Sequence, residues 1–191
     1  AGAVTFAGPA GSRGYIDKSG VAQTAALNAP RLTAQGLYVT GSVDSESLRL
    51  PSANNLLNAT NFTVCLDVLT TATSTVMWYC QAGGTAYTAQ IGAAGGNLHF
   101  VSMVGGVQSA FSLGPVDHTK NKKITVVSDA TANKTFVYVD GTLKATVNSK
   151  QDYISGANLI LCDAAGNYGA HYYNSFRTWL SALTPQQVSN L

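Results

Sequence analysis

The sequence has few charged residues. Asp, Glu, Lys and Arg make up 10% of the 191 residues, and the formal net charge is +2, whereas about 25% of an average domain is charged. The basic residues are scattered, so no basic patch predicts a nucleic-acid or anionic-membrane partner. Ser, Thr, Asn and Gly occupy the polar positions instead, a composition typical of extracellular or virion β-proteins.

The side chains that catalysis needs are equally scarce. Glu46 is the single glutamate among nine acidic residues, whereas glycosidases need two carboxylates roughly 5–10 Å apart. Asp44 and Glu46 stand in a Ser-rich stretch and fit a solvated loop. His99, His118 and His171 lie far apart and lack the spacing of a catalytic triad or zinc site. The sequence therefore predicts a protein that is not an enzyme and holds no metal or cofactor.

Disulfide and membrane signals are also weak. Three cysteines are an odd number, which argues against a disulfide framework. If residues 62–70 and 75–81 form a hairpin, Cys65 faces Cys80 and could bond to it, although a buried free thiol is the commoner outcome. No run approaches the ~20 apolar residues of a membrane span, and we expect a signal peptide to be absent or already removed.

The clearest pattern that is present predicts a β-hairpin over residues 134–147. Two alternating runs flank Asp140-Gly141, a pair that favours the tight turns of hairpins. Alternation places successive side chains on opposite faces. We therefore expect Val137 and Val139 on one face of the first strand, and a shared face on the return strand for Leu143, Ala145 and Val147.

The rest of the chain predicts one all-β domain. Apolar residues alternate over residues 62–69, and turn signals recur about every 8–12 residues, as in a sandwich. Near the end, Thr184, Pro185 and Gln187 form a capping box, and Leu183 can staple onto Val188, so a short helix is expected over residues 185–190. Residues 1–34, rich in Ala and Gly, are interpreted as an extended arm before a domain over residues 35–191.

The C-terminal third resembles the laminin-G-like members of the concanavalin A-like lectin/glucanase superfamily. The resemblance rests on Phe136–Leu143, then Leu159-Ile160-Leu161, then Phe176–Val188, which match a "vyvDG" hairpin, a strand and a final strand entering "aLtpeqv". Before that last strand this chain has Tyr172-Tyr173-Asn174 where the family usually has a glycine. The resemblance implies an antiparallel jelly-roll β-sandwich with a short C-terminal helix.

The N-terminal part is similar to a lead-in found in many bacteriophage tail and virion-surface proteins. The matching pieces are Ser12–Gly20, Asn28-Ala29-Pro30-Arg31, Gly36–Val39 and Asn54–Leu57. This resemblance implies location in a virion, with a secreted protein as the alternative. It also implies virion proteins of the capsid or tail as partners, and a homo-oligomer, with a trimer among the options.

One segment, residues 163–174, carries the chemistry of a glycan site. Sugar sites combine an aromatic face with amide or carboxylate partners for hydroxyls. The candidate ligand-binding residues are Asp163, Asn167, Tyr168, His171 and Tyr172. The alternative is that a tyrosine of this segment packs inward and the rest turns a corner. Asp163 with Asn167 could also serve calcium, although an Asx-type turn explains the pair more simply.

Three functions remain open at this point. The first is a non-catalytic, lectin-like adhesion module of a bacteriophage virion, in a tail fibre or as capsid decoration, that binds host-surface or environmental polysaccharide. The second is a purely structural capsid-decoration protein whose residues 1–34 are an arm exchanged between subunits or laid along a neighbour. The third is a carbohydrate-binding module of a secreted bacterial polysaccharide-degrading enzyme.

Overall fold

The computed structural model describes residues 2–5, 14–16, 22–24, 31–39, 48–50, 61–73, 75–81, 87–104, 106–151, 158–161 and 170–191. These ranges contain sixteen strands and one helix: β1 (Gly2–Thr5), β2 (Gly14–Ile16), β3 (Ala22–Thr24), β4 (Arg31–Thr33), β5 (Gly36–Val39), β6 (Leu48–Leu50), β7 (Phe62–Thr70), β8 (Thr75–Gln81), β9 (Tyr87–Ala94), β10 (Asn97–Val104), β11 (Val107–Pro115), β12 (Lys122–Asp129), β13 (Lys134–Val139), β14 (Thr142–Val147), β15 (Asn158–Leu161), β16 (His171–Trp179) and α1 (Pro185–Ser189). The helix of the described residues is too short to cross a membrane.

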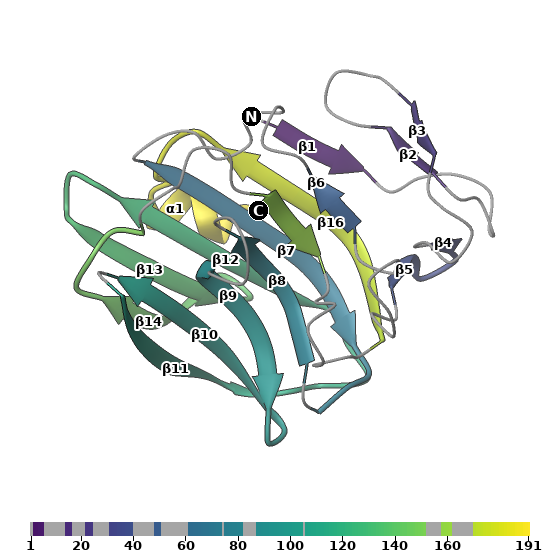
Figure 1. Ribbon diagram of the computed structural model, residues 1–191, viewed down its shortest axis with the longest axis horizontal. Coiled ribbons are helices and arrows are strands. Elements are labelled where there is room, and N and C mark those ends of the chain that lie inside the picture. The colour runs from purple at the N-terminus through teal and green to yellow at the C-terminus, as the bar shows by residue number, and fades with distance from the viewer. Residues whose placement is uncertain are drawn as a thin grey trace.

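The strands form two antiparallel sheets packed face to face (Figure 1). The ten-stranded sheet has the order β14-β13-β12-β7-β16-β1-β2-β3, with β5 also paired to β16 and β4 to β5. The six-stranded sheet has the order β11-β10-β9-β8-β15-β6. Some neighbouring strands, such as β7 and β16 or β8 and β15, come from distant parts of the chain, as in a jelly roll. The predicted all-β, antiparallel jelly-roll sandwich with a short C-terminal helix is confirmed.

The core lies between the sheets because alternate side chains of each strand face inward. On β7 the inward set is Phe62, Val64, Leu66 and Val68, as the sequence predicts. These side chains meet those of the six-stranded sheet. Core residues from the other strands include Leu37, Val39, Ile91, Leu98, Phe100, Leu113, Ile124, Val126, Val137, Val139, Tyr173 and Phe176.

The hairpin over β13 and β14 is confirmed, with one correction. Asp140 and Gly141 both have positive φ, 50° and 76°, as a tight hairpin turn requires. A register shift between Val137 and Tyr138 leaves Lys144 as an extra residue on β14. The bulge moves Leu143 away from the face of Ala145, so Leu143 is 47% exposed while Ala145 is buried. The expected shared face of Leu143, Ala145 and Val147 is therefore wrong at Leu143.

The C-terminal helix forms as predicted and packs on the outer face of the ten-stranded sheet. Thr184 Oγ1 accepts from the Gln187 N–H, and Gln187 Oε1 accepts from the Thr184 N–H, which completes the capping box. Val188 is buried with Val127 and Tyr138, and Leu183 packs against the same cluster. The helix therefore covers part of a sheet face that would otherwise expose apolar side chains.

The predicted hairpin between residues 62–70 and 75–81 is wrong. Strand β7 lies in the ten-stranded sheet and β8 in the six-stranded sheet, so the link between them crosses from one layer to the other. Cys65 faces Thr125 and Arg177 instead of Cys80. It is a buried free thiol, which removes the geometric basis for a Cys65–Cys80 bond.

The described parts of residues 1–34 are short extended strands. Strand β1 pairs with β16 along Gly2–Thr5, within the sheet of its own chain. The β4–β5 hairpin crosses residue 34. The division into an arm over residues 1–34 and a domain over residues 35–191 stays a prediction, as does the exchange of that arm between subunits.

Buried polar groups connect the two layers at two places. The Gln151 amide is 1% exposed and lies beside Ser102 of β10 and Thr135 of β13. Elsewhere, the Tyr173 hydroxyl of β16 donates to the Met77 carbonyl of β8. Buried polar groups are costly unless they are hydrogen-bonded, and directional partners fix how one sheet sits over the other.

Candidate ligand-binding surface

Of the predicted site residues, the structure describes His171 and Tyr172, which lie at the start of β16 and point in different directions. Asp163, Asn167 and Tyr168 lie outside the described residues. His171 and Tyr172 are consecutive on a strand, so their side chains point to opposite faces. His171 turns into the sandwich and Tyr172 turns outward. The structure therefore does not bring these two side chains together.

His171 is part of the interior. It is 0% exposed, and its Nε2 lies 2.9 Å from Thr75 Oγ1 of β8, in the opposite sheet. Its ring also lies against Tyr173, with centroids 5.9 Å apart. An enclosed ring does not reach a ligand at the surface, so this position suits His171 to holding β16 against β8.

Tyr172 stacks on Tyr38 at the outer face of the ten-stranded sheet. The two residues are directly opposite each other on β16 and β5, and their ring centroids are 4.8 Å apart at an interplanar angle of 43°. Both side chains are half-buried, so part of the aromatic pair meets solvent. Such a pair offers an apolar face of the kind that packs on the C–H side of a sugar ring.

Polar groups adjoin this aromatic pair on β7. Leu69 is directly opposite Tyr172, and Asp67 is the next outward residue along the strand because Leu66 and Val68 point into the core. Asp67 Oδ1 accepts a hydrogen bond of 3.1 Å from Asn121 Nδ2. We call the surface formed by Tyr38, Asp67, Leu69, Asn121 and Tyr172 the outer-face patch.

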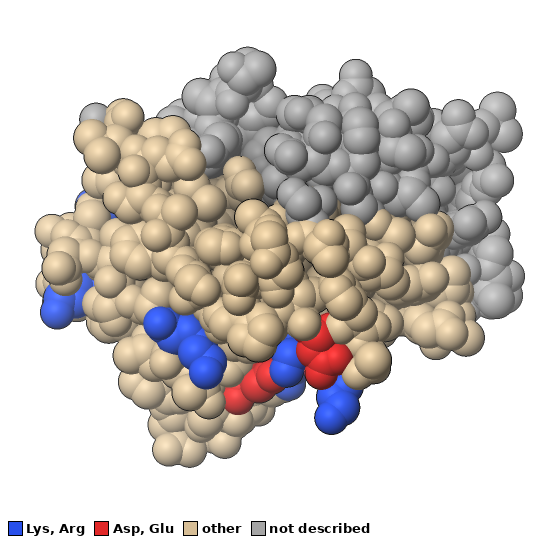
Figure 2. Space-filling view, turned by 90° about the horizontal axis from the view of Figure 1, so that it is seen from below, with Lys and Arg blue, Asp and Glu red and all other residues tan. Residues whose placement is uncertain are grey.

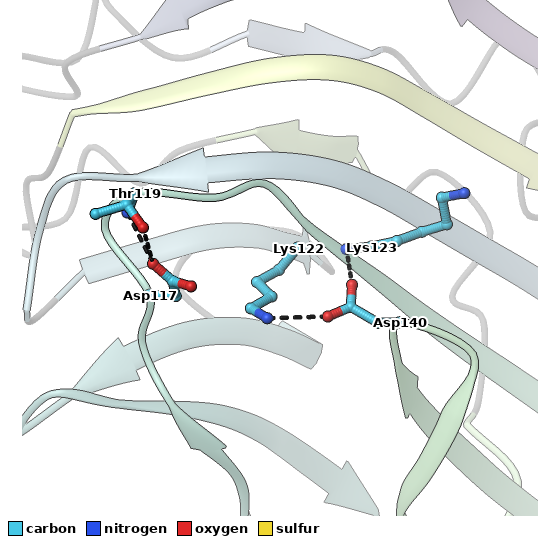
Figure 3. A network of polar contacts seen from close by, with 5 residues as sticks. All are labelled: Asp117, Thr119, Lys122, Lys123 and Asp140. Carbon is cyan, nitrogen blue, oxygen red and sulfur yellow. Dashed lines mark hydrogen bonds and ion pairs between the residues drawn. The ribbon is translucent and has the colours of Figure 1, made fainter.

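The loop that carries Asn121 is held in place by hydrogen bonds (Figure 3). Asp117 Oδ1 accepts from the Thr119 N–H at 2.9 Å and from the Thr119 hydroxyl at 2.6 Å. His118 Nδ1 lies 3.0 Å from the Thr70 carbonyl at the end of β7. A fixed loop keeps the Asn121 amide beside Asp67 without further ordering when a ligand binds.

A second set of contacts in Figure 3 joins the start of β12 to the turn between β13 and β14. Lys122 Nζ lies 3.0 Å from Asp140 Oδ2, and the Lys123 N–H donates to Asp140 Oδ1 at 3.0 Å. Partial burial of Asp140 opposes its ionisation. The hydrogen bonds from Lys123 and Lys122 outweigh this effect and lower the pKa of Asp140. This carboxylate therefore stays ionised through the neutral range and keeps its partners.

The charges around the loop with Asp117 and the turn with Asp140 have both signs. Figure 2 shows acidic side chains with basic ones next to them among largely uncharged described residues. The pKa of Asp117 is lowered by the Thr119 hydroxyl and then by the Thr119 N–H. Within the described ranges, no three His, Cys, Asp or Glu side chains are grouped to hold a metal ion. These side chains suit a neutral, polar ligand that is recognised by stacking and by hydrogen bonds.

Sequence reasoning identified Tyr172 and missed the other four members of the patch. Tyr38 precedes Tyr172 by more than a hundred residues, and only the pairing of β5 with β16 brings them together. Asn121 stands among Lys120, Lys122 and Lys123 and carries no sequence signal of its own. Asp67 did carry a signal, because a carboxylate inside an apolar alternating strand marks the face that is not core.

Comparisons with known proteins give the fold. No protein-family model matches the chain, and no curated protein matches it. Among solved structures, the native heptameric SAP-like pentraxin of Limulus polyphemus is similar with a TM-score of 0.61 at 15% identity, covering 80% of this chain and 79% of that one. The likeness gives the fold, a jelly-roll β-sandwich.

Two further structures share this architecture over part of their length. A Trypanosoma rangeli sialidase, in complex with sialic acid, matches with a TM-score of 0.73 at 15% identity, covering 98% of this chain and 31% of the sialidase. The binding domain of botulinum neurotoxin serotype G matches with a TM-score of 0.65 at 12% identity, covering 98% of this chain and 49% of that one. The chain thus spans under half of these two proteins, and the likeness concerns the fold alone.

Proposed function

We propose that this chain is a non-catalytic, lectin-like binding protein whose outer-face patch contacts glycans. The observation that carries the proposal is the half-exposed Tyr38–Tyr172 pair, with the Asp67 carboxylate and its Asn121 partner one outward position further along β7. This set supplies a stacking face together with acceptors and donors for sugar hydroxyls. The non-catalytic part of the proposal rests on the single glutamate of the sequence.

Neutral glycans are the first ligands to test, because the Asp67 carboxylate of the outer-face patch disfavours an anionic ligand, and acidic glycans are the second set. The T. rangeli sialidase was solved with sialic acid, and botulinum neurotoxin type C depends on two ganglioside molecules to enter cells. Both proteins share this fold with the present chain. At 10–15% identity these precedents guide the choice of probes, and the residues of the outer-face patch supply the argument for binding.

A glycan array followed by calorimetry on the full chain tests the proposal. Tyr172→Ala should weaken binding of any hit about tenfold, because loss of one stacking ring costs on the order of 1.4 kcal/mol. Tyr172→Phe keeps the ring and should retain most of the affinity, and Asp67→Asn should weaken binding by removing a charged acceptor. Leu180→Ala, at a side chain 51% exposed outside the patch, is the matched control.

Two results would reject this function. A blank array with natively folded protein would favour a purely structural decoration role. Binding that survives all patch variants would place the ligand elsewhere, for example on residues 163–168, whose Asp163, Asn167 and Tyr168 remain predicted ligand residues.

We propose a bacteriophage virion, in the tail or as capsid decoration, as the place where this binding protein acts. The support is the likeness of residues 12–57 to virion lead-in segments. Immunogold labelling of purified virions tests the location, together with the identity of the neighbouring genes. A polysaccharide-degrading catalytic domain in the same reading frame would instead make the chain a carbohydrate-binding module of a secreted enzyme.

A further inference from the structure

Strand β11 ends the six-stranded sheet and is exposed. Among the described strands it pairs only with β10. Its first four residues are all exposed, and Val107 is 67% exposed. In an antiparallel ladder, alternate backbone groups of a terminal strand point away from the sheet. Such an edge can accept a further strand.

Edge strands of natural proteins usually carry protection against pairing, such as a lysine, a proline or a bulge. Strand β14, the terminal strand of the ten-stranded sheet, has both Lys144 and a bulge at that residue. Residues 107–112 of β11, with the sequence Val-Gln-Ser-Ala-Phe-Ser, have no charge and no proline. Their register with β10 is unbroken from Val107 to Ser112, and the irregularity comes only after Ser112.

We propose that this edge pairs with the same edge of a second copy of the chain. Two copies related by a two-fold axis would place their β11 strands antiparallel, with Ala110 at the axis and Gln108 of one copy opposite Ser112 of the other. Self-pairing requires that a strand carry no charge that meets its own copy across the axis. The uncharged stretch 107–112 meets this requirement, whereas Lys144 on β14 does not.

The exposed apolar side chain at the start of β11 adds to this interface. Val107, Leu143 and Leu180 are the large apolar side chains that are exposed in the described part of the chain. Leu143 lies opposite Tyr138 on the outer face of the ten-stranded sheet, where α1 packs, so it stays outside the interface although β14 runs beside β11 (Figure 1). A copy docked on β11 would therefore cover Val107 together with the strand edge. The five residues 108–112 that pair across the axis span roughly 17 Å, so the interface is small and association depends on concentration.

Analytical ultracentrifugation of the full chain, at concentrations up to about 1 mM, tests the proposal. The wild-type chain should shift from monomer to dimer as concentration rises. Ala110→Lys places two lysines near the axis and should raise the dissociation constant about tenfold or more. Thr131→Lys adds the same charge at an exposed turn between β12 and β13 and should leave the dissociation constant unchanged.

Amide hydrogen exchange gives a readout that does not depend on mass. Residues 107–112 should exchange more slowly at high than at low protein concentration, and Ala110→Lys should remove that difference. A wild-type chain that stays monomeric would overturn the proposal, as would a dimer or trimer that Ala110→Lys leaves intact. The outer-face patch lies on the other sheet, so glycan affinity should be the same in Ala110→Lys, and failure here says nothing against glycan binding.

Discussion

Replacing Gln151 by Leu tests whether the buried polar cluster holds the two sheets together. Gln151 Nε2 donates to Ser102 Oγ at 2.9 Å and to Thr135 Oγ1 at 3.1 Å. Its backbone N–H donates to Ser128 Oγ at 2.9 Å, a bond that the substitution keeps. Leucine has a similar volume, so the change removes the amide without opening a large cavity. The effect therefore reports on hydrogen bonding.

The expected cost can be worked out from these contacts. The variant leaves the buried Ser102 hydroxyl without the amide, whereas Thr135 Oγ1 still donates to the Ser149 carbonyl at 2.8 Å. Leaving the Ser102 hydroxyl unpaired costs at most about 1–3 kcal/mol, and the loss of one partner at the Thr135 hydroxyl costs no more than that. We expect Gln151→Leu to lower the free energy of unfolding by about 2–4 kcal/mol.

Urea unfolding followed by tryptophan fluorescence measures this free energy. Gln186→Leu, at an exposed position of α1, is the matched control and should change the free energy of unfolding by less than about 0.5 kcal/mol. Ser102→Ala in the Gln151→Leu background should restore about 1 kcal/mol, because both polar partners are then gone. A loss below about 1 kcal/mol in Gln151→Leu, or additive effects in the double variant, would refute the reasoning.

Four further predictions follow from single contacts. Gly36→Ala should cost about 2–4 kcal/mol in urea unfolding, because a Cβ would lie 2.5 Å from the Tyr173 carbonyl oxygen and φ is +118°. Burial raises the pKa of the Cys65 thiol, so mass mapping after treatment with a thiol reagent at pH 7–8 should find it unmodified until urea unfolds the protein. Asp140→Asn should lower stability by at most about 1 kcal/mol at pH 7. The lowered pKa of Asp140 stabilises the fold above its unfolded pKa of about 3.9, so this gap should close as pH falls below 4, as denaturation curves at several pH values would show. Thr184→Ala removes the helix cap and should lower the melting temperature by an amount equivalent to about 1 kcal/mol.

Local patterns predicted the elements well where alternation was unbroken. The hairpin around Asp140-Gly141 and the inward face of β7 follow from period-two spacing. The capping box at Thr184 fixed the helix start. Prediction failed where one extra residue shifts the alternation. At the start of β16, the register shift between Tyr173 and Ser175 interrupts the pattern, so the sequence indicates the final strand only from Phe176 onward.

The relation between elements was harder to predict than the elements themselves. A short link between two strands can close a hairpin or cross between layers, and the residues after Thr70 do not distinguish the two. The expected Cys65–Cys80 opposition failed for that reason. The candidate site shows the same limit, because Tyr38 and Asp67 reach Tyr172 only through pairing between strands that are distant in sequence.

The directed links between the sheets have a mechanical consequence. Apolar layers can slide over each other at modest cost, since dispersion has little directional preference. Here Gln151 joins the layers in one place, and the β16–β8 bonds of His171 and Tyr173 join them in another. Two separate sets of hydrogen bonds resist both sliding and rotation of one sheet over the other. Under a shearing load, the sandwich should therefore hold its shape until one of them ruptures, and then yield abruptly.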